Sequence, residues 1–158
     1  MDFRFHSSYI AIAVALLLGA VPQTAKSQTM EERLQRGDAV VRSLNNGAPQ
    51  PALEGMRQDF PFLAGATQGY ALGDVWSRPG LDNRTRQLAA VAVFAAMGET
   101  AFMRIHAGNA LNIGVSEEEL KEVIYMMTVP AGFPRAIAAS QALSELFAKR
   151  RAAPDKQP

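Results

Sequence analysis

The chain has 158 residues, of which 48% are hydrophobic and 20% charged, a composition typical of a single globular domain and not of a disordered or fibrous chain. It contains no cysteine, which excludes disulfide bonds, thiolate metal sites and thiol-based catalysis. The net charge of +1 leaves no basic excess of the kind that nucleic-acid binding requires, so no nucleic-acid partner is expected.

Residues 1–27 have the layout of a secretory signal peptide. A short polar start precedes the almost wholly apolar run 9–21, and small polar residues follow, with Ala25 and Ser27 just before the expected cleavage point. The apolar run is shorter than the ~20 residues that span a bilayer, which favours cleavage over a membrane anchor. We therefore expect export to the periplasm or beyond, without stable membrane insertion. Cleavage leaves equal numbers of acidic and basic side chains, and His106 as the one histidine.

The rest of the chain predicts helices. Apolar residues recur at helical spacing in six segments, at about 30–44, 60–76, 83–97, 99–111, 117–128 and 134–150. A short helical turn is also expected at 51–56. Asp82 suits an N-cap, Gly98 suits a helix end, and Ser116 with Glu119 forms a capping-box pattern. No strand pattern stands out, so the fold class is all-α, with about six helices in one domain.

One of these helices has an unusual composition. Every residue from Leu88 to Met97 is apolar. A helix that is apolar on all sides is buried on all sides, and a domain of this size cannot easily cover it alone. We therefore predict either a central helix or one shared with a second subunit, and hence a homo-oligomer. The domain is expected to span 30–150, followed by a disordered tail at 151–158.

A first group of candidate functional residues lies on one helix face. Glu99, Phe102, Met103 and His106 fall on the same side of the predicted helix, and Asn109 follows one turn later. By this pattern alone, the histidine is as compatible with a buried core position as with a functional one. A single imidazole without thiols makes a zinc or iron site improbable, so no metal or other cofactor is predicted.

A second group lies in the segment before the apolar helix. Asp74 and Arg78 are four residues apart, a spacing that allows an ion pair. Arg84 and Arg86 stand at a predicted helix N-terminus, where cations are electrostatically unfavourable. This placement points to an anionic partner, either a carboxylate of the protein or one of a ligand. Solvated surface arginines are the alternative interpretation.

Several motifs together resemble the carboxymuconolactone decarboxylase family, over about residues 70–147. They are Gly-Asp-Val-Trp-Ser-Arg-Pro-Gly-Leu-Asp-x-x-Thr-Arg at 73–86, His-x-x-Asn-Ala-Leu-Asn-x-Gly at 106–114 and Ala-Gly-Phe-Pro at 131–134. The resemblance implies an all-helical, alkylhydroperoxidase-D-like fold that assembles as a homotrimer or homohexamer.

The family has two chemistries, and the sequence helps to choose between them. The peroxidase branch carries Cys-x-x-Cys-x-x-x-His with an upstream glutamate. Here Glu99 and Phe102 stand at the cysteine positions, His106 matches the histidine, and Gln87 stands at the glutamate position. Without a thiolate there is no peroxide nucleophile. The resemblance therefore implies the decarboxylase branch.

The sequence also departs from the decarboxylases. Asp74 stands where they usually have glutamate, and Pro130 where an aromatic residue is more common. The pathway that uses carboxymuconolactone is cytoplasmic, whereas this chain is expected to be exported. A different lactone or cyclic acid is therefore the expected substrate.

The resemblance suggests a cofactor-free decarboxylase of a small carboxylated lactone or related cyclic acid. We expect the arginines at 78, 84 and 86 to hold the substrate carboxylate, because their planar fork is bidentate. His106 is the expected proton donor, oriented or kept charged by Asp74 or Glu99. Trp76 and Asn109 complete the candidate binding residues. The alternative is a non-catalytic exported oligomer that binds small acids or a partner protein.

Two arrangements around His106 would distinguish these functions. A water-accessible pocket with an arginine and a carboxylate favours the enzyme. Burial of the imidazole among Phe102, Met103 and Met126 favours the binding protein.

Overall fold

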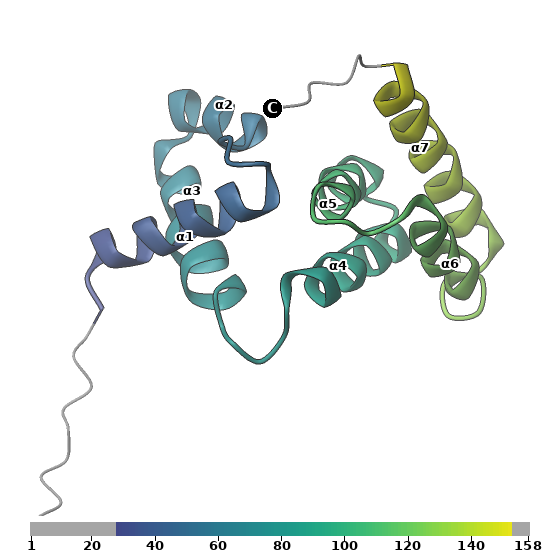
Figure 1. Ribbon diagram of the computed structural model, residues 1–158, viewed down its shortest axis with the longest axis horizontal. Coiled ribbons are helices and arrows are strands. Elements are labelled where there is room, and N and C mark those ends of the chain that lie inside the picture. The colour runs from purple at the N-terminus through teal and green to yellow at the C-terminus, as the bar shows by residue number, and fades with distance from the viewer. Residues whose placement is uncertain (1–27, 153–158) are drawn as a thin grey trace, which may run out of the picture.

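The computed structural model describes residues 28–152, which are helical throughout apart from short connections (Figure 1). The helices are α1 (Met30–Leu44), α2 (Pro51–Asp59), α3 (Pro61–Ala66), the π-helix η1 (Thr67–Trp76), α4 (Asn83–Met97), α5 (Thr100–Asn112), α6 (Glu117–Met127) and α7 (Phe133–Ala152). The described residues contain no strand, which confirms the predicted all-α class.

The helices form two groups, joined by the connection at 77–82 (Figure 1). In the N-terminal lobe, α1 packs along η1, and α2 packs against α3. In the C-terminal lobe, α4 and α5 are neighbours and α6 and α7 pack against them. Each lobe has its own buried cluster of apolar side chains. The larger one lies among α4 to α7, around Val91, Met103, Leu120 and Leu143.

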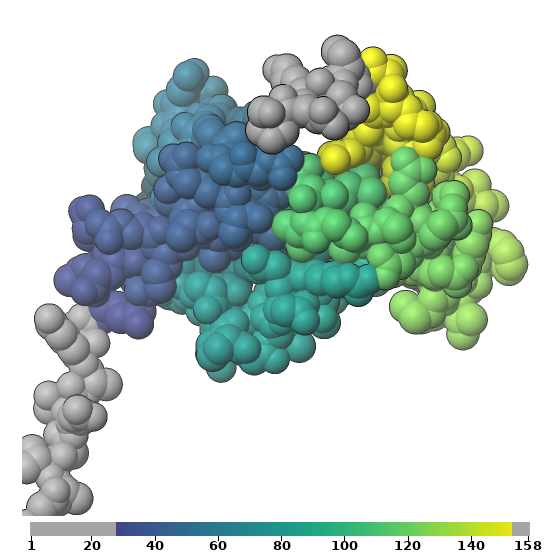
Figure 2. Space-filling model, viewed as in Figure 1, coloured from purple at the N-terminus to yellow at the C-terminus, as the bar shows by residue number. Residues whose placement is uncertain are grey.

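The two lobes touch at polar contacts beside their cores, and their surfaces meet in Figure 2. The Asn112 side chain donates a hydrogen bond of 3.1 Å to the carbonyl oxygen of Leu44. The Asn83 side chain donates one of 3.3 Å to the hydroxyl of Ser43. These contacts fix the C-terminal end of α1 against α4 and α5.

Each residue that the sequence predicted at a helix end caps or ends that helix in the structure. The Asp82 carboxylate accepts a 2.6 Å hydrogen bond from the amide of Thr85 at the start of α4. Gly98 ends α4 with a φ of 83°, a left-handed conformation that glycine adopts without strain. Ser116 and Glu119 form the capping box of α6.

The predicted helices at 60–76, 51–56 and 134–150 differ from the observed ones. The first is divided into α3 and the ten-residue η1, whose π-helical turns are wider than α-helical ones. The short turn is a full helix, α2, that continues to Asp59. The last helix, α7, continues to Ala152, so the predicted tail begins inside it. The predicted signal peptide and residues 153–158 lie outside the described residues.

Glycines permit close contact between α1 and η1. A β-carbon added to Gly37 would overlap the carbonyl oxygen of Gln68, and one added to Gly73 would overlap the carbonyl oxygen of Arg33. The backbones of the two helices are therefore in contact at these glycines. Any residue with a β-carbon at either position would force the helices apart. This contact orients η1 and places Trp76 at its C-terminal end.

The apolar helix α4 is only partly covered by the described residues. Val91 and Ala95 are buried, whereas Val93 and Met97 are 55% and 59% exposed. Other large apolar side chains are exposed on α6, α7 and the connection between them: Tyr125, Met126, Val129, Phe133 and Ile137. Exposed apolar surface of this kind is typical of a protein interface.

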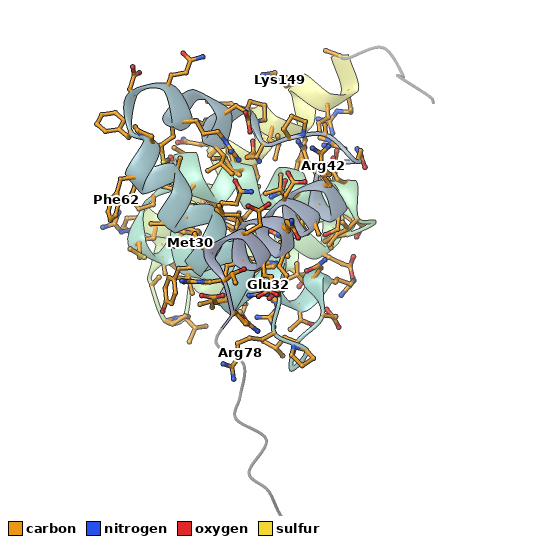
Figure 3. All side chains as sticks on the ribbon, turned by 90° about the vertical axis from the view of Figure 1, so that its left-hand side faces the viewer. Met30, Glu32, Arg42, Phe62, Arg78 and Lys149 are labelled. Atoms are coloured by element: carbon orange, nitrogen blue, oxygen red, sulfur yellow. The ribbon has the colours of Figure 1, made fainter. Side chains whose placement is uncertain are left out.

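We predict that the protein self-associates through this surface. Light scattering at micromolar concentration should give the mass of an oligomer, and Val93→Glu with Met97→Glu should shift it toward the monomer, because burying two unpaired carboxylates is unfavourable. Phe62→Glu is the control, since Phe62 lies on α3 in the other lobe and is 88% exposed. Figure 3 labels it at the edge of the molecule. A monomeric wild-type chain would contradict the prediction.

None of the described helices combines the length and the apolar character needed to cross a bilayer.

Candidate active site

His106 lies on α5 in an aromatic environment. Its imidazole stacks on the Trp76 indole, with ring centroids 5.5 Å apart, and on the Phe94 ring, with centroids 5.2 Å apart. Trp76 ends η1 in the N-terminal lobe and Phe94 belongs to α4 in the C-terminal lobe, so the imidazole contacts both lobes. Burial lowers the pKa of His106 below its ordinary value, because a charged imidazolium is poorly solvated there.

Gln87 holds the imidazole in place. This α4 side chain is fully buried, and its Oε1 lies 2.9 Å from Nδ1 of His106. In the arrangement assigned here, the amide oxygen accepts a hydrogen bond, so Nδ1 carries a proton and Nε2 is the free ring nitrogen. The amide nitrogen of Gln87 has no partner among the described residues.

A cavity of about 180 Å³ opens beside His106, between the lobes. The α5 side of its lining holds His106, Asn109, Phe102 and Ile105. The other side comes from the N-terminal lobe and consists of Val41, Leu44, Gln50, Ala52, Leu53, Met56, Thr67 and Leu72. No lysine, arginine, aspartate or glutamate of the described chain lines it. The cavity is therefore apolar, with a few neutral polar groups.

Two of the predicted binding residues lie at this site. Trp76 stacks on the imidazole, and its indole nitrogen donates a 3.2 Å hydrogen bond to Asn83. Asn109 lines the cavity one turn after His106 and is 9% exposed. Glu99 is close in sequence but precedes α5 as its N-cap residue, is exposed, and is not the partner of His106.

Asp74 is engaged elsewhere. Its carboxylate forms ion pairs of 2.5 Å with Arg33 and 3.1 Å with Arg36, both on α1. The hydrogen bond from Arg33 is the main cause that lowers the pKa of Asp74. The ion pair with Arg78 that the spacing allows is not the one formed, because η1 ends at Trp76 and leaves Arg78 in the following connection. Asp74 thus binds α1 to η1.

The three predicted carboxylate-binding arginines do not line the cavity. Arg84 pairs with Glu119 of the α6 capping box. Arg86 donates hydrogen bonds to the carbonyl oxygens of Leu81 and Arg78, at 3.1 and 2.5 Å. Arg78 lines a separate open groove and lies at the lower edge of the molecule in Figure 3. For Arg84, the anionic partner expected from its position is therefore a carboxylate of the protein.

Gln87 and the N-terminal wall of the cavity received no functional role from the sequence. Gln87 stands at the upstream glutamate position of the peroxidase branch, and this correspondence was a usable signal for its contact with His106. No comparable signal marked residues 41–56, because they face His106 only after the lobes fold together. No group of three potential metal ligands occurs in the described part of the chain.

Comparison with known proteins identifies the family. A model of the carboxymuconolactone decarboxylase family matches residues 61–145, more than half of the chain. The chain belongs to this family. The match to the carboxymuconolactone decarboxylase family includes Trp76, Gln87, His106 and Asn109, but not the cavity wall formed by residues 41–56.

Several relatives are similar to the chain. It is 38% identical to a 4-carboxymuconolactone decarboxylase of Acinetobacter baylyi, over 74% of this chain and 81% of that protein. It is 34% identical to a nitrosuccinic acid decarboxylase of Metarhizium robertsii, over 44% of this chain and about half (49%) of that protein. It is 24% identical to an uncharacterized 15.0 kDa protein of Paracoccus denitrificans, over 79% of this chain and 95% of that protein.

Proposed function

We propose that this chain is a cofactor-free decarboxylase that acts on a small carboxylated lactone or related cyclic acid. Its family and two relatives named as decarboxylases support a decarboxylase-type activity. The observation that carries the proposal is the position of His106, which lines an apolar cavity while Gln87 and two aromatic rings fix its orientation. The imidazole is not sealed in the core.

Decarboxylation needs a proton at the carbon that loses the carboxyl group. The carbon–carbon bond to the carboxylate breaks, carbon dioxide leaves, and the electron pair spreads into a conjugated carbonyl of the substrate. A proton then bonds to that carbon. His106 fits this step because, as an imidazolium, it keeps one N–H on Gln87 and offers the other from Nε2. After the transfer it is the neutral tautomer that Gln87 already stabilises.

The apolar lining favours the bond-breaking step. In the bound acid the negative charge is concentrated on two oxygens, whereas in the transition state it spreads over the substrate. A lining without charged side chains solvates the concentrated charge of the bound carboxylate poorly. The dispersed charge of the transition state loses less by leaving water, so the lining destabilises the bound acid more than the transition state. The cavity therefore lowers the barrier to loss of carbon dioxide.

One observation favours a second candidate function. The arginine and carboxylate expected beside His106 in an enzyme are absent from the cavity lining among the described residues. A neutral apolar cavity also suits a non-catalytic protein that binds small acids. For either function, we propose that export follows from the predicted signal peptide at 1–27.

Release of carbon dioxide separates the two candidates. The protein is incubated with a panel of carboxylated lactones and cyclic acids, with a chelator and no added cofactor, and carbon dioxide is measured by mass spectrometry. We expect many turnovers per subunit for at least one acid. If nuclear magnetic resonance shows acids bound but none loses carbon dioxide, the decarboxylase function is wrong and the binding function stands.

A further inference from the structure

We propose that the cavity beside His106 selects acids that carry one carboxylate on one apolar ring and excludes acids with a second charged group. This inference rests on the proposed function and names the substrate class of that site. It predicts that this chain differs, in the number of carboxylates that its substrate carries, from the relative whose name gives 4-carboxymuconolactone as substrate.

The first argument is charge. The polar members of the lining are Gln50, Thr67, His106 and Asn109, and all of their side chains except the imidazole are permanently neutral. Burial lowers the pKa of His106, so its imidazole is uncharged for most of the time near neutral pH. A second carboxylate buried there would have no cation to pair with, which makes its transfer from water unfavourable.

The arginines of the neighbouring helices are not free to supply that cation. Arg33 and Arg36 of α1 are paired with Asp74. Arg57 of α2 pairs with Glu54 at 3.2 Å and also donates a hydrogen bond to Gln68. Drawing one of these arginines into the cavity would leave its present partner unpaired.

The second argument concerns hydrogen bonds. Asn109 is largely buried, lines the cavity and carries a side-chain amide that can donate hydrogen bonds. The Thr67 hydroxyl lines the same cavity from η1. These neutral donors can satisfy the oxygens of a single carboxylate without a fixed positive charge. A carboxylate held in this way keeps the low-polarity surroundings that favour its loss.

The third argument is size. An apolar cavity of about 150 Å³ accommodates a benzene molecule. The cavity here measures about 180 Å³ and is lined mostly by aliphatic and aromatic side chains. It therefore accepts one ring with its carboxyl group. Part of the wall opposite His106 comes from α1 and α2, outside the matched family segment, and part comes from Thr67 and Leu72 of η1, inside it.

Binding of two matched acids tests the inference. Benzoate and isophthalate share the same ring and differ by one carboxylate. Isothermal titration of the full chain at pH 7.5 is expected to give a Kd for benzoate at least ~10-fold lower than that for isophthalate. Equal affinities, or tighter binding of isophthalate, would overturn the inference.

A charge introduced into the cavity provides a second test. Ala52 is exposed at the rim on α2, so Ala52→Arg is expected to bring the isophthalate Kd close to that of benzoate, while Ala52→Gln, of similar length and neutral, keeps the preference. Gln50→Arg repeats the test if Ala52→Arg does not fold. An unchanged preference in a folded arginine variant would count against the inference.

The two proposals fail in different ways. A preference for benzoate without release of carbon dioxide from any acid would refute the decarboxylase function and support the ligand class. Release of carbon dioxide from dicarboxylic acids, with tight isophthalate binding, would support the function and refute the ligand class.

Discussion

Replacing His106 with glutamine is expected to lower the rate of carbon dioxide release by about 100-fold or more, because positioned proton transfer typically contributes roughly 10²–10⁴ to a rate. Glutamine can still form a hydrogen bond to Gln87, but it cannot exchange a proton near neutral pH. The measurement is kcat at saturating substrate, with circular dichroism to show that the helices are intact. Phe62→Gln is the control, since Phe62 is exposed on α3 and does not line the cavity.

The pH dependence adds a second expectation for His106. If the imidazolium donates the proton, kcat of the wild type falls as pH rises through the pKa of His106. Burial lowers that pKa, so the fall should occur at a more acidic pH than for an exposed histidine. The His106→Gln variant should show no such fall in kcat. A variant that keeps its rate but melts at a lower temperature would show that His106 is only a buried polar residue that needs its partner.

Gly37→Ala is expected to lower the free energy of unfolding by about 2 kcal/mol. The new β-carbon would overlap a backbone carbonyl of Gln68, which cannot turn aside as a side chain can. Overpacking of this kind costs about 3 kcal/mol, and the better helix propensity of alanine returns about 1 kcal/mol. Urea denaturation followed by circular dichroism measures the change.

Gly55→Ala is the matched control for this prediction. Gly55 lies inside α2, and a β-carbon added there meets no atom within 4 Å. The same substitution should therefore raise the free energy of unfolding by up to about 1 kcal/mol through propensity alone. Equal stability of Gly37→Ala and the wild type would mean that α1 and η1 are not in backbone contact.

The all-α fold and most helix ends were predictable because their signals are local. Asp82, Gly98 and Ser116 act within one turn of the helix end that they mark. The π-helical turns of η1 were not predictable, because no local pattern in the sequence marks them; η1 packs on α1, some thirty residues earlier. The partners of Asp74 escaped prediction for the same reason, since Arg33 and Arg36 become neighbours only when α1 packs on η1.

The candidate site was predictable where helical spacing defines it. His106 and Asn109 share a face of α5, and both line the cavity. Gln87 lies on a different helix and reaches the imidazole only through the packing of α4 against α5. The catalytic and binding roles assigned to Asp74, Glu99 and the three arginines at 78, 84 and 86 stay predictions, as do export and the number of subunits.

The stacking of Trp76 on His106 gives the protein an optical probe of its own. Trp76 is the one tryptophan of the chain, so all indole emission comes from a ring 5.5 Å from the imidazole. An indole face attracts a charged imidazolium more strongly than a neutral imidazole, and its emission responds to that charge and to any molecule that displaces water beside it. A ligand that changes the charge or the position of His106 can therefore be followed through Trp76 without a label, before the natural acid is known.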